Sequence, residues 1–307
     1  MLKMDKMKRK RVGKIRATAN RYRKEEIKKY IEFYKLELQD VKHRFEMLSC
    51  LGESIFLQSF TPKDPIGNVV VIHGYLDHAG SMSNLINDLT RNRYKVITYD
   101  LQGHGLSSGK RAEINRFNDY VAVFHEVYTK LRRQTSLPVH ILAHSTGGAI
   151  VMDYMLRFHT DVQKVIFVAP LVRSHAWKIS KLGFFLIKPF VKELKRLFKR
   201  NSSNHDYLKF VKTDPLQHHK VPLTWFEALV AWNKELKNYP TSNKKVTVIQ
   251  GDRDRTVDWK YNLGFIQRKF PNVKVQIIHG GDHQLLNEHQ PILQETLKYI
   301  HKELNGD

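Results

Sequence analysis

The sequence predicts an α/β fold with a mostly parallel central sheet, helices on both faces and a helical insertion. Two observations predict it. From residue 68 onward, short β-branched runs alternate with helical patterns. The candidate catalytic residues follow the carboxyl ends of these runs. This alternation is typical of parallel strands joined by crossover helices, whose ligands bind at the carboxyl edge of the sheet. The 307 residues suffice for one such domain with an insertion.

Each predicted strand is an apolar, β-branched run that ends in a turn. In chain order these runs are 68–75 (NVVVIHGY), 94–100 (YKVITYD), 140–144 (HILAH), 165–169 (VIFVA), 246–251 (VTVIQG) and 273–278 (VKVQII). The patterns between and after them predict helices over residues 81–93, 115–133, 146–159 and 291–304.

The turn after run 140–144 carries a candidate nucleophile. Ser145 lies between small residues in AHSTG (143–147), directly before a helical pattern. A sharp strand-to-helix turn of this kind lifts one serine hydroxyl out of the sheet, and the small neighbours leave it accessible. Ala143 departs by one methyl group from the glycine that is more usual there. The pattern therefore predicts a nucleophile elbow at Ser145.

The turn after run 246–251 carries two candidate acids, Asp252 and Asp254. A catalytic serine needs a histidine to take its proton and a carboxylate to orient that histidine. We prefer Asp254, because it lies three residues after Gly251 and three before Val257. Asp252 is then left for a turn or solvent role.

The turn after run 273–278 carries two candidate bases, His279 and His283. His279 belongs to the end of the strand pattern, whereas His283 lies beyond two glycines, so we prefer His283. In the α/β-hydrolase order, serine comes first, then the acid, then histidine, each at the carboxyl end of a strand. For the oxyanion hole we expect the backbone N–H groups of Tyr75, after the first run, and of Thr146, after the nucleophile.

In combination these motifs resemble the monoacylglycerol lipase and lysophospholipase branch of the α/β-hydrolases, often grouped as serine aminopeptidase S33. The motifs are HGYLDH (73–78), DLQGHGLSSG (100–109), AHSTGG (143–148), GDRD (251–254) and GDH (281–283). The resemblance covers residues 45–304. It implies the α/β-hydrolase fold, hydrolysis of carboxylic esters of lipid-like substrates, no cofactor, and a cap inserted after the sixth strand. Ala143, Asp77 (often glutamate in the branch) and Gln102 depart from its pattern.

We therefore divide the chain into four segments. Residues 1–44 are a basic tail and an amphipathic helix, 45–170 and 241–307 are the hydrolase core, and 171–240 are the helical cap. Aromatic residues of the cap are candidates for substrate binding, namely Trp177, Phe184 and Phe185.

The net charge of +22 is concentrated in two segments. Residues 1–44 contain 16 Lys and Arg against 6 Asp and Glu, and residues 173–220 contain 12 against 3. Such blocks can attract anionic membranes or nucleic acid.

In the first basic block, residues 3–16 form a polar basic tail and residues 21–45 show helical spacing. The apolar positions are Ile27, Tyr30, Ile31, Tyr34, Leu38, Val41 and Phe45. We favour a helix docked on the domain by this stripe; the alternative is a helix on a membrane surface.

The second basic block predicts a helix that starts at Pro189. Its apolar stripe is Phe190, Val191, Leu194, Leu197 and Phe198, opposite Lys192, Lys195, Arg196, Lys199 and Arg200. Such a helix can line the cap or lie on an anionic membrane.

Cys50 is the only cysteine, no apolar run approaches the ~20 residues of a membrane span, and the basic N-terminus lacks a secretory apolar segment. We expect a cytoplasmic protein, with peripheral contact at the inner membrane surface as an option. Neither His218-His219 nor the His279 and His283 pair has the geometry of a metal site, so no metal is expected.

The predicted function is a serine esterase of mono-acyl lipids, a monoacylglycerol or a lysophospholipid, which acts through an acyl-enzyme. One alternative is an aminopeptidase or amidase of the same fold, although no acidic site for a peptide's free amine is recognisable. The other is a non-catalytic basic protein that binds membranes or nucleic acid. No zinc-finger, RNA-recognition or phosphate-loop pattern supports a specific nucleic-acid partner. The sequence does not specify an oligomeric state.

Overall fold

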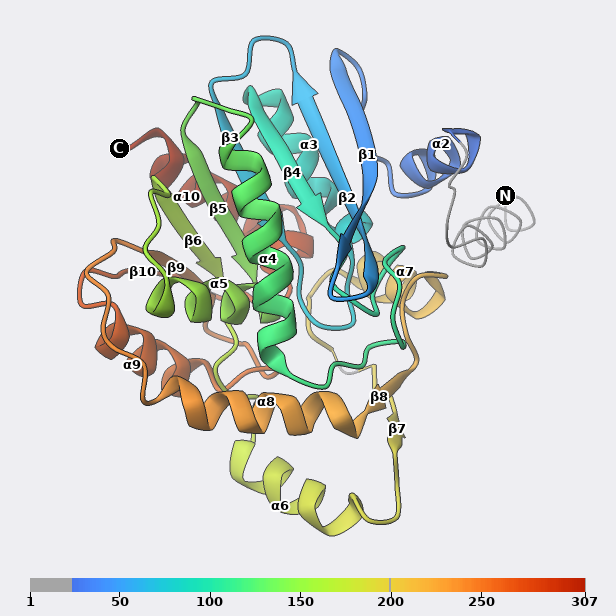
Figure 1. Cartoon of the computed structure of the whole chain (residues 1–307), viewed down its shortest axis with the longest axis vertical. Coiled ribbons are helices and arrows are strands. Elements are labelled where there is room, and N and C mark those ends of the chain that lie inside the picture. The colour runs from blue at the N-terminus through green and yellow to red at the C-terminus, as the bar shows by residue number, and fades with distance from the viewer. Residues whose placement is uncertain (1–23, 199, 307) are drawn as a thin grey trace.

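The computed structural model describes residues 24–198 and 200–306, which contain an eight-stranded sheet between two layers of helices (Figure 1). Its strands lie in the order β1 (Val41–Cys50), β2 (Glu53–Pro62), β4 (Tyr94–Tyr99), β3 (Gly67–Ile72), β5 (Val139–His144), β6 (Lys164–Val168), β9 (Thr247–Gly251) and β10 (Lys274–Ile278). Neighbours from β4 to β10 are parallel, whereas β2 pairs antiparallel with both β1 and β4. The predicted mostly parallel α/β fold is confirmed.

Helices bury both faces of the parallel strands. One core cluster holds residues of α4 (Phe117–Arg132), α5 (Thr146–Arg157) and α9 (Trp259–Lys269), and the other holds residues of α2 (Lys24–Phe33), α3 (Ser83–Arg91) and α10 (Gln290–Asn305). Alternate residues of β3 enter the two clusters: Val70 and Ile72 the first, Val69 and Val71 the second. This two-sided burial explains why the central strands read as continuous apolar runs rather than as alternating ones.

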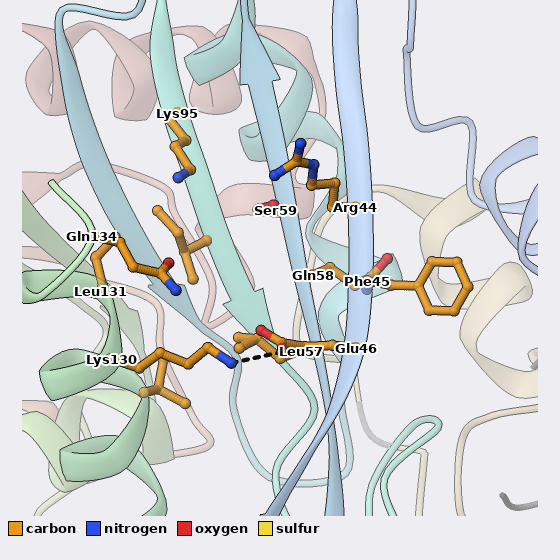
Figure 2. A pocket seen from close by; sticks show the side chains of 12 residues that line it. Arg44, Phe45, Glu46, Leu57, Gln58, Ser59, Lys95, Lys130, Leu131 and Gln134 are labelled. Atoms are coloured by element: carbon orange, nitrogen blue, oxygen red, sulfur yellow. Dashed lines mark hydrogen bonds and ion pairs between the residues drawn. The ribbon is translucent and has the colours of Figure 1, made fainter. Parts of the chain in front are cut away.

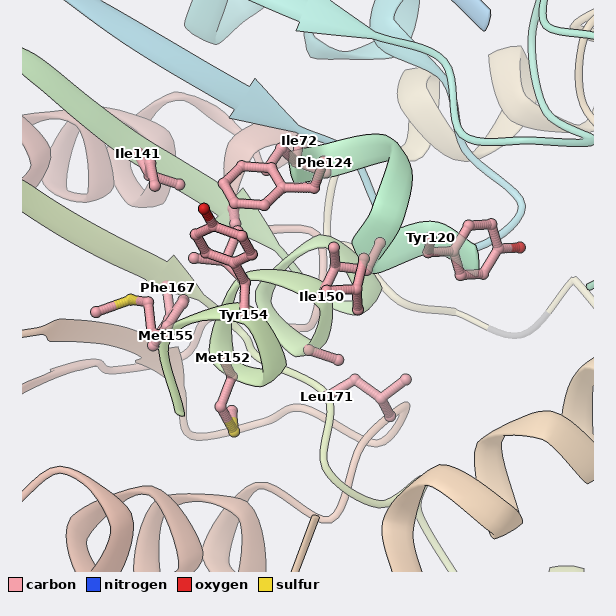
Figure 3. Packing of buried hydrophobic residues seen from close by; sticks show 14 of the residues in the cluster. Ile72, Tyr120, Phe124, Ile141, Ile150, Met152, Tyr154, Met155, Phe167 and Leu171 are labelled. Carbon is pink, nitrogen blue, oxygen red and sulfur yellow. The ribbon is translucent and has the colours of Figure 1, made fainter. Parts of the chain in front are cut away.

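The predicted crossover helices are confirmed. Residues 81–93, 115–133, 146–159 and 291–304 contain α3, α4, α5 and α10, with ends shifted by a few residues. Helix α9, at Trp259–Lys269, was not predicted. Figure 3 shows how side chains of α4 (Phe124) and α5 (Ile150) gather against the sheet (Ile141).

The predicted helix over residues 21–45 is wrong beyond Phe33. Ile27, Tyr30 and Ile31 of α2, and Tyr34 directly after it, are buried in the second core cluster, so this helix is docked as favoured. Lys35 then adopts φ +56°, which ends the helix, and Val41 and Phe45 belong to β1. The spacing of four between these two residues suits one face of a strand as well as of a helix. The predicted tail over residues 3–16 lies outside the described residues.

The helix predicted to start at Pro189 is also wrong. The chain between β6 and β9 contains α6 (Trp177–Ile187), α7 (His205–Thr213), α8 (Leu223–Leu236) and a two-stranded ribbon of β7 (Glu193–Lys195) and β8 (Lys220–Pro222). Leu194 pairs with Val221 across this ribbon, so backbone pairing with a distant segment replaces the helical hydrogen bonds. Within the described residues, no helix combines the length and apolar character needed to cross a bilayer.

Candidate active site

Ser145 lies at the sharp turn between β5 and α5, with φ +51° and ψ −111°. Non-glycine residues rarely adopt a positive φ, so the surrounding structure must hold this turn. Its N–H donates to the carbonyl of Val168 on β6 at 3.0 Å. At Gly147 a Cβ would lie 2.5 Å from the carbonyl oxygen of Ile72, so only glycine lets α5 approach β3 this closely. The local sequence therefore provides the turn that the AHSTG pattern predicts.

A chain of hydrogen bonds joins Ser145 to His283 and Asp254. Nε2 of His283 lies 3.0 Å from Oγ of Ser145, and its Nδ1 lies 2.7 Å from Oδ2 of Asp254. All three residues are buried, with 7 %, 3 % and 4 % exposed surface respectively. Because the carboxylate accepts, Nδ1 carries the proton and Nε2 is free to accept from the serine hydroxyl. This arrangement can activate a nucleophilic hydroxyl.

Asp254 is held in its ionised form. Its Oδ1 accepts backbone N–H groups from Thr256 at 2.8 Å and Val257 at 3.0 Å, and its Oδ2 also accepts from the side chain of Gln250. Burial alone raises the pKa of this carboxyl, but the nearby His283 and the two backbone donors outweigh burial and hold the pKa below its usual value.

Asp252 and His279, the alternative acid and base, contact each other away from Ser145. Nδ1 of His279 lies 2.9 Å from Oδ2 of Asp252, and the N–H of Gly280 donates to the other carboxylate oxygen. The His279 side chain is 86 % exposed. The four candidates thus separate into a buried pair that reaches Ser145 and a solvent-facing pair that joins two turns.

His144, for which the sequence predicted no role, contacts the main chain of His283. Its Nε2 donates to the backbone carbonyl of His283 at 3.1 Å. Burial, together with His283, lowers the pKa of His144 to about 3, so the ring is neutral at pH 7. The signal that the sequence offers is its position directly before Ser145. Its partner, His283, is 139 residues away, so the sequence does not show the contact.

The turn after β3 lies against Ser145. A Cβ at Gly74 would lie 3.1 Å from Cβ of Ser145, so the backbone here passes close to the serine side chain. His73 fixes this turn: its Nε2 accepts from the N–H of Leu101, and its Nδ1 donates to the carbonyl of Gly74. The ring of Tyr75 stacks on Trp225 of α8 with centroids 3.6 Å apart.

Of the two expected oxyanion donors, Thr146 is the first residue of α5. Its N–H therefore has no partner within the helix. Tyr75 follows the close-approach residue Gly74. Both expected donors thus belong to backbone segments next to Ser145.

The three cap residues expected near the substrate occupy two environments. Trp177 and Phe184 are buried and pack on Phe226 of α8, with ring centroids 5.6 and 5.3 Å apart. Phe185 is 58 % exposed. Phe185 therefore faces solvent in this structure, and the other two hold α6 on α8.

A buried ion pair joins the turn after β3 to the segment between β6 and β9. Nε2 of His78 lies 2.9 Å from Oδ2 of Asp214, and the hydroxyl of Tyr34 donates to the other oxygen at 2.6 Å. Burial disfavours charged His78, but Asp214, with Asp100 and Asp77 nearby, outweighs burial and raises the pKa of His78 to about 9. The pair therefore ties three segments together: α2, the turn beside Ser145, and the end of α7.

Known proteins resemble this chain in sequence. The profile of the serine aminopeptidase, S33 family matches residues 63–290. The chain is 26% identical to a monoacylglycerol lipase of Mycolicibacterium smegmatis, over 81% of this chain and 93% of the relative. It is also 26% identical to monoglyceride lipase of Rattus norvegicus (82% and 86% covered). It is 21% identical to a probable lysophospholipase L2 of Haemophilus influenzae (77% and 83% covered).

Solved structures show the same fold. A soluble variant of monoglyceride lipase from Saccharomyces cerevisiae superposes with a TM-score of 0.75 at 20% identity, covering 89% of this chain and 97% of that one. Monoacylglycerol lipase from Paleococcus ferrophilus superposes with a TM-score of 0.70 at 18% identity, covering 82% and 99%. The expected α/β-hydrolase fold is confirmed.

The His78–Asp214 pair predicts a pH-dependent stability. A pKa raised from 6.5 to about 9 stabilises the fold fully below pH 6.5, and this contribution is lost as the pH rises through 9. The shift corresponds to about 3 kcal/mol in the free energy of unfolding. In urea titrations, His78→Gln should therefore cost more stability at pH 6 than at pH 10. An equal cost at both pH values contradicts the assignment. His205→Gln, on the exposed start of α7, is the control and should show no such pH dependence.

Proposed function

Because the chain belongs to the serine aminopeptidase S33 family, we propose that it cleaves the ester bond of a mono-acyl lipid, a monoacylglycerol or a lysophospholipid. The protein is an esterase of carboxylic esters, as its similarity to monoglyceride lipases and lysophospholipases indicates. The observation that carries the detailed proposal is the continuous hydrogen-bonded chain from Asp254 through His283 to Ser145.

The first half of the reaction forms an acyl-enzyme. Oγ of Ser145 attacks the ester carbonyl carbon while Nε2 of His283 takes the hydroxyl proton, and Asp254 stabilises the imidazolium that results. Backbone N–H groups of Tyr75 and Thr146 bind the oxyanion of the tetrahedral intermediate. Collapse of that intermediate breaks the bond to the leaving alcohol, which receives the proton from His283.

In the second half, water replaces the alcohol. His283 takes a proton from water as the water attacks the acyl carbonyl, and the proton then returns to Oγ of Ser145 as the fatty acid leaves. Each step uses Nε2 of His283. The N–H at Nδ1 must therefore stay hydrogen-bonded to Asp254 throughout. The carbonyl contact from His144 supports that orientation.

We assign residues 171–240 to a cap over this site. Its helix α8 contributes Trp225, which stacks on Tyr75 of the oxyanion turn, and Trp232, which stacks on Phe117 at the start of α4 with centroids 4.4 Å apart. These contacts support a cap that is held in a fixed position relative to the turn beside Ser145.

Replacement of Ser145 tests the proposal. Ser145→Ala removes the nucleophile but leaves the buried turn nearly unchanged in volume, so kcat for monoacylglycerol and p-nitrophenyl esters should fall by about 10⁴-fold or more. Initial rates across an acyl series from acetyl to palmitoyl should peak at medium or long chains in the wild type. Ser49→Ala, on the exposed face of β1, is the matched control and should keep full activity. Ester hydrolysis by Ser145→Ala at the wild-type rate would refute the assignment.

The cap also presents an exposed apolar face, which we propose rests on an anionic membrane surface. Seven large apolar side chains between residues 179 and 197 are 42 to 86 % exposed: Ile179, Leu182, Phe185, Leu186, Phe190, Leu194 and Leu197. Exposed apolar groups of this number on one segment are typical of interaction surfaces. In Figure 1, α6 forms the outermost layer of the molecule, beyond α8.

Basic residues accompany this face. Exposed lysines at 178, 188, 192 and 195 alternate with the apolar positions along the segment. A lysine near an anionic bilayer contributes about 1 kcal/mol of attraction, and insertion of apolar side chains adds to it. This combination favours an anionic lipid surface over a neutral one.

Liposome flotation tests the membrane contact. The wild type should float with phosphatidylglycerol vesicles at low salt and less so at high salt, because salt screens the lysines. A triple variant, Leu182→Ser, Phe185→Ser and Phe190→Ser, should stay in the dense fraction. Leu51→Ser, which removes an exposed leucine from the turn between β1 and β2, is the control and should float normally. Absence of wild-type flotation at low salt would rule the contact out.

A further inference from the structure

A groove of about 320 Å³ lies between helix α4 and strands β1, β2 and β4. Its hydrocarbon lining comes from Leu57, Ile97, Val127 and Leu131. Figure 2 shows that Arg44, Lys95 and Gln134 extend into the same space from three different elements. The volume is near the lower end of the roughly 300–1,000 Å³ typical of small-molecule pockets.

Strand register explains why these side chains meet. Arg44 of β1 is opposite Ser59 of β2, and Ser59 is opposite Ile97 of β4, so the three form one row across the sheet. Lys95 is two residues before Ile97 and therefore points to the same face. The small side chain of Ser59 leaves the space between Arg44 and Lys95 open.

The groove has an unbalanced positive charge. Its one carboxylate, Glu46, pairs with Lys130 at 2.6 Å. Among residues 24–198 and 200–306, no carboxylate lies within ion-pair distance of Arg44 or Lys95. Burial and the nearby Arg44 both lower the pKa of Lys95, as expected for two cations that share a partly dry site. An anion between them would relieve this repulsion.

The groove is separate from the candidate active site. Lys95 is the second residue of β4, whereas the carboxyl end of that strand leads to Asp100, which accepts the N–H of Ala79 in the turn region after β3. Gln134 follows the carboxyl end of α4, whereas Phe117 at its start packs on the cap. The side of the groove that holds Lys95 and Gln134 therefore lies at the opposite end of both elements.

We propose that this groove is a second binding site, for a small amphipathic anion with a carboxylate or phosphate head and a short hydrocarbon chain. The head lies between Arg44 and Lys95, where Ser59 and Gln134 add neutral hydrogen-bonding groups. The chain lies along the hydrocarbon of Ile97 and Leu131. The site goes beyond the proposed ester hydrolysis and does not depend on Ser145.

Equilibrium dialysis with labelled octanoate and octyl phosphate tests the site, since the two probes have chains of nearly equal length and different head groups. At least one should bind saturably. Arg44→Gln and Lys95→Gln should each weaken that binding about tenfold or more, the loss expected when a charge-assisted hydrogen bond is removed. Lys298→Gln removes the same charge from an exposed position on α10, across the sheet, and should bind as the wild type does. Ester hydrolysis should be unchanged in all three variants.

The position of the bound anion is tested separately, with a diazirine derivative of whichever probe binds more tightly. Photolabelling should modify peptides that contain Ile97 or Leu131, and Lys95→Gln should abolish that labelling. Three results would overturn the proposal: no saturable binding of either anion, equal affinity of Lys95→Gln and Lys298→Gln, or octanol bound as tightly as the anions. None of these readouts involves ester cleavage, so failure here is distinguishable from failure of the proposed hydrolase activity.

Discussion

The backbone turn at Ser145 is the constraint on which the rest of this structure depends. Its positive φ costs about 1–3 kcal/mol, and the turn persists only because its surroundings leave no alternative. Residues 146–156 of α5 are all buried, and Gly147 brings the start of that helix against the end of β3. The same close approach places the turn at Gly74 beside the serine. One strained residue therefore positions both the Ser145 side chain, the proposed nucleophile, and the segment expected to bind the oxyanion.

The remaining parts of the site are held from several directions. Asp254 is fixed by backbone donors of its own turn, while His283 is fixed by Asp254 on its ring and by His144 on its main chain. The ion pair of His78 and Asp214 joins the turn after β3 to the end of α7. The core strands thus set the geometry of Ser145, His283 and Asp254. The end of α2 and the segment between β6 and β9 are coupled to it through one buried charge pair.

Much of this could be predicted from the sequence because the signals are local. The central strands are continuous apolar runs, and the turns after them carry Ser145, Asp254 and His283 in a fixed order. The parts that were missed depend on distant partners. The spacing of Val41 and Phe45 fits a helix or a strand, and pairing with β2 decides it. Leu194 is in a ribbon because Val221 pairs with it, and His144 shows its role only beside the carbonyl of His283.

The central claim is that Ser145 is an activated nucleophile, and reaction with a fluorophosphonate probe tests it most directly. Such a probe phosphonylates a serine that a neighbouring base activates much faster than it reacts with an ordinary serine. Intact mass and peptide mapping of the native protein should show one phosphonyl group per chain, on Ser145. An unlabelled native protein, or a label on another serine with Ser145 unmodified, would contradict the account.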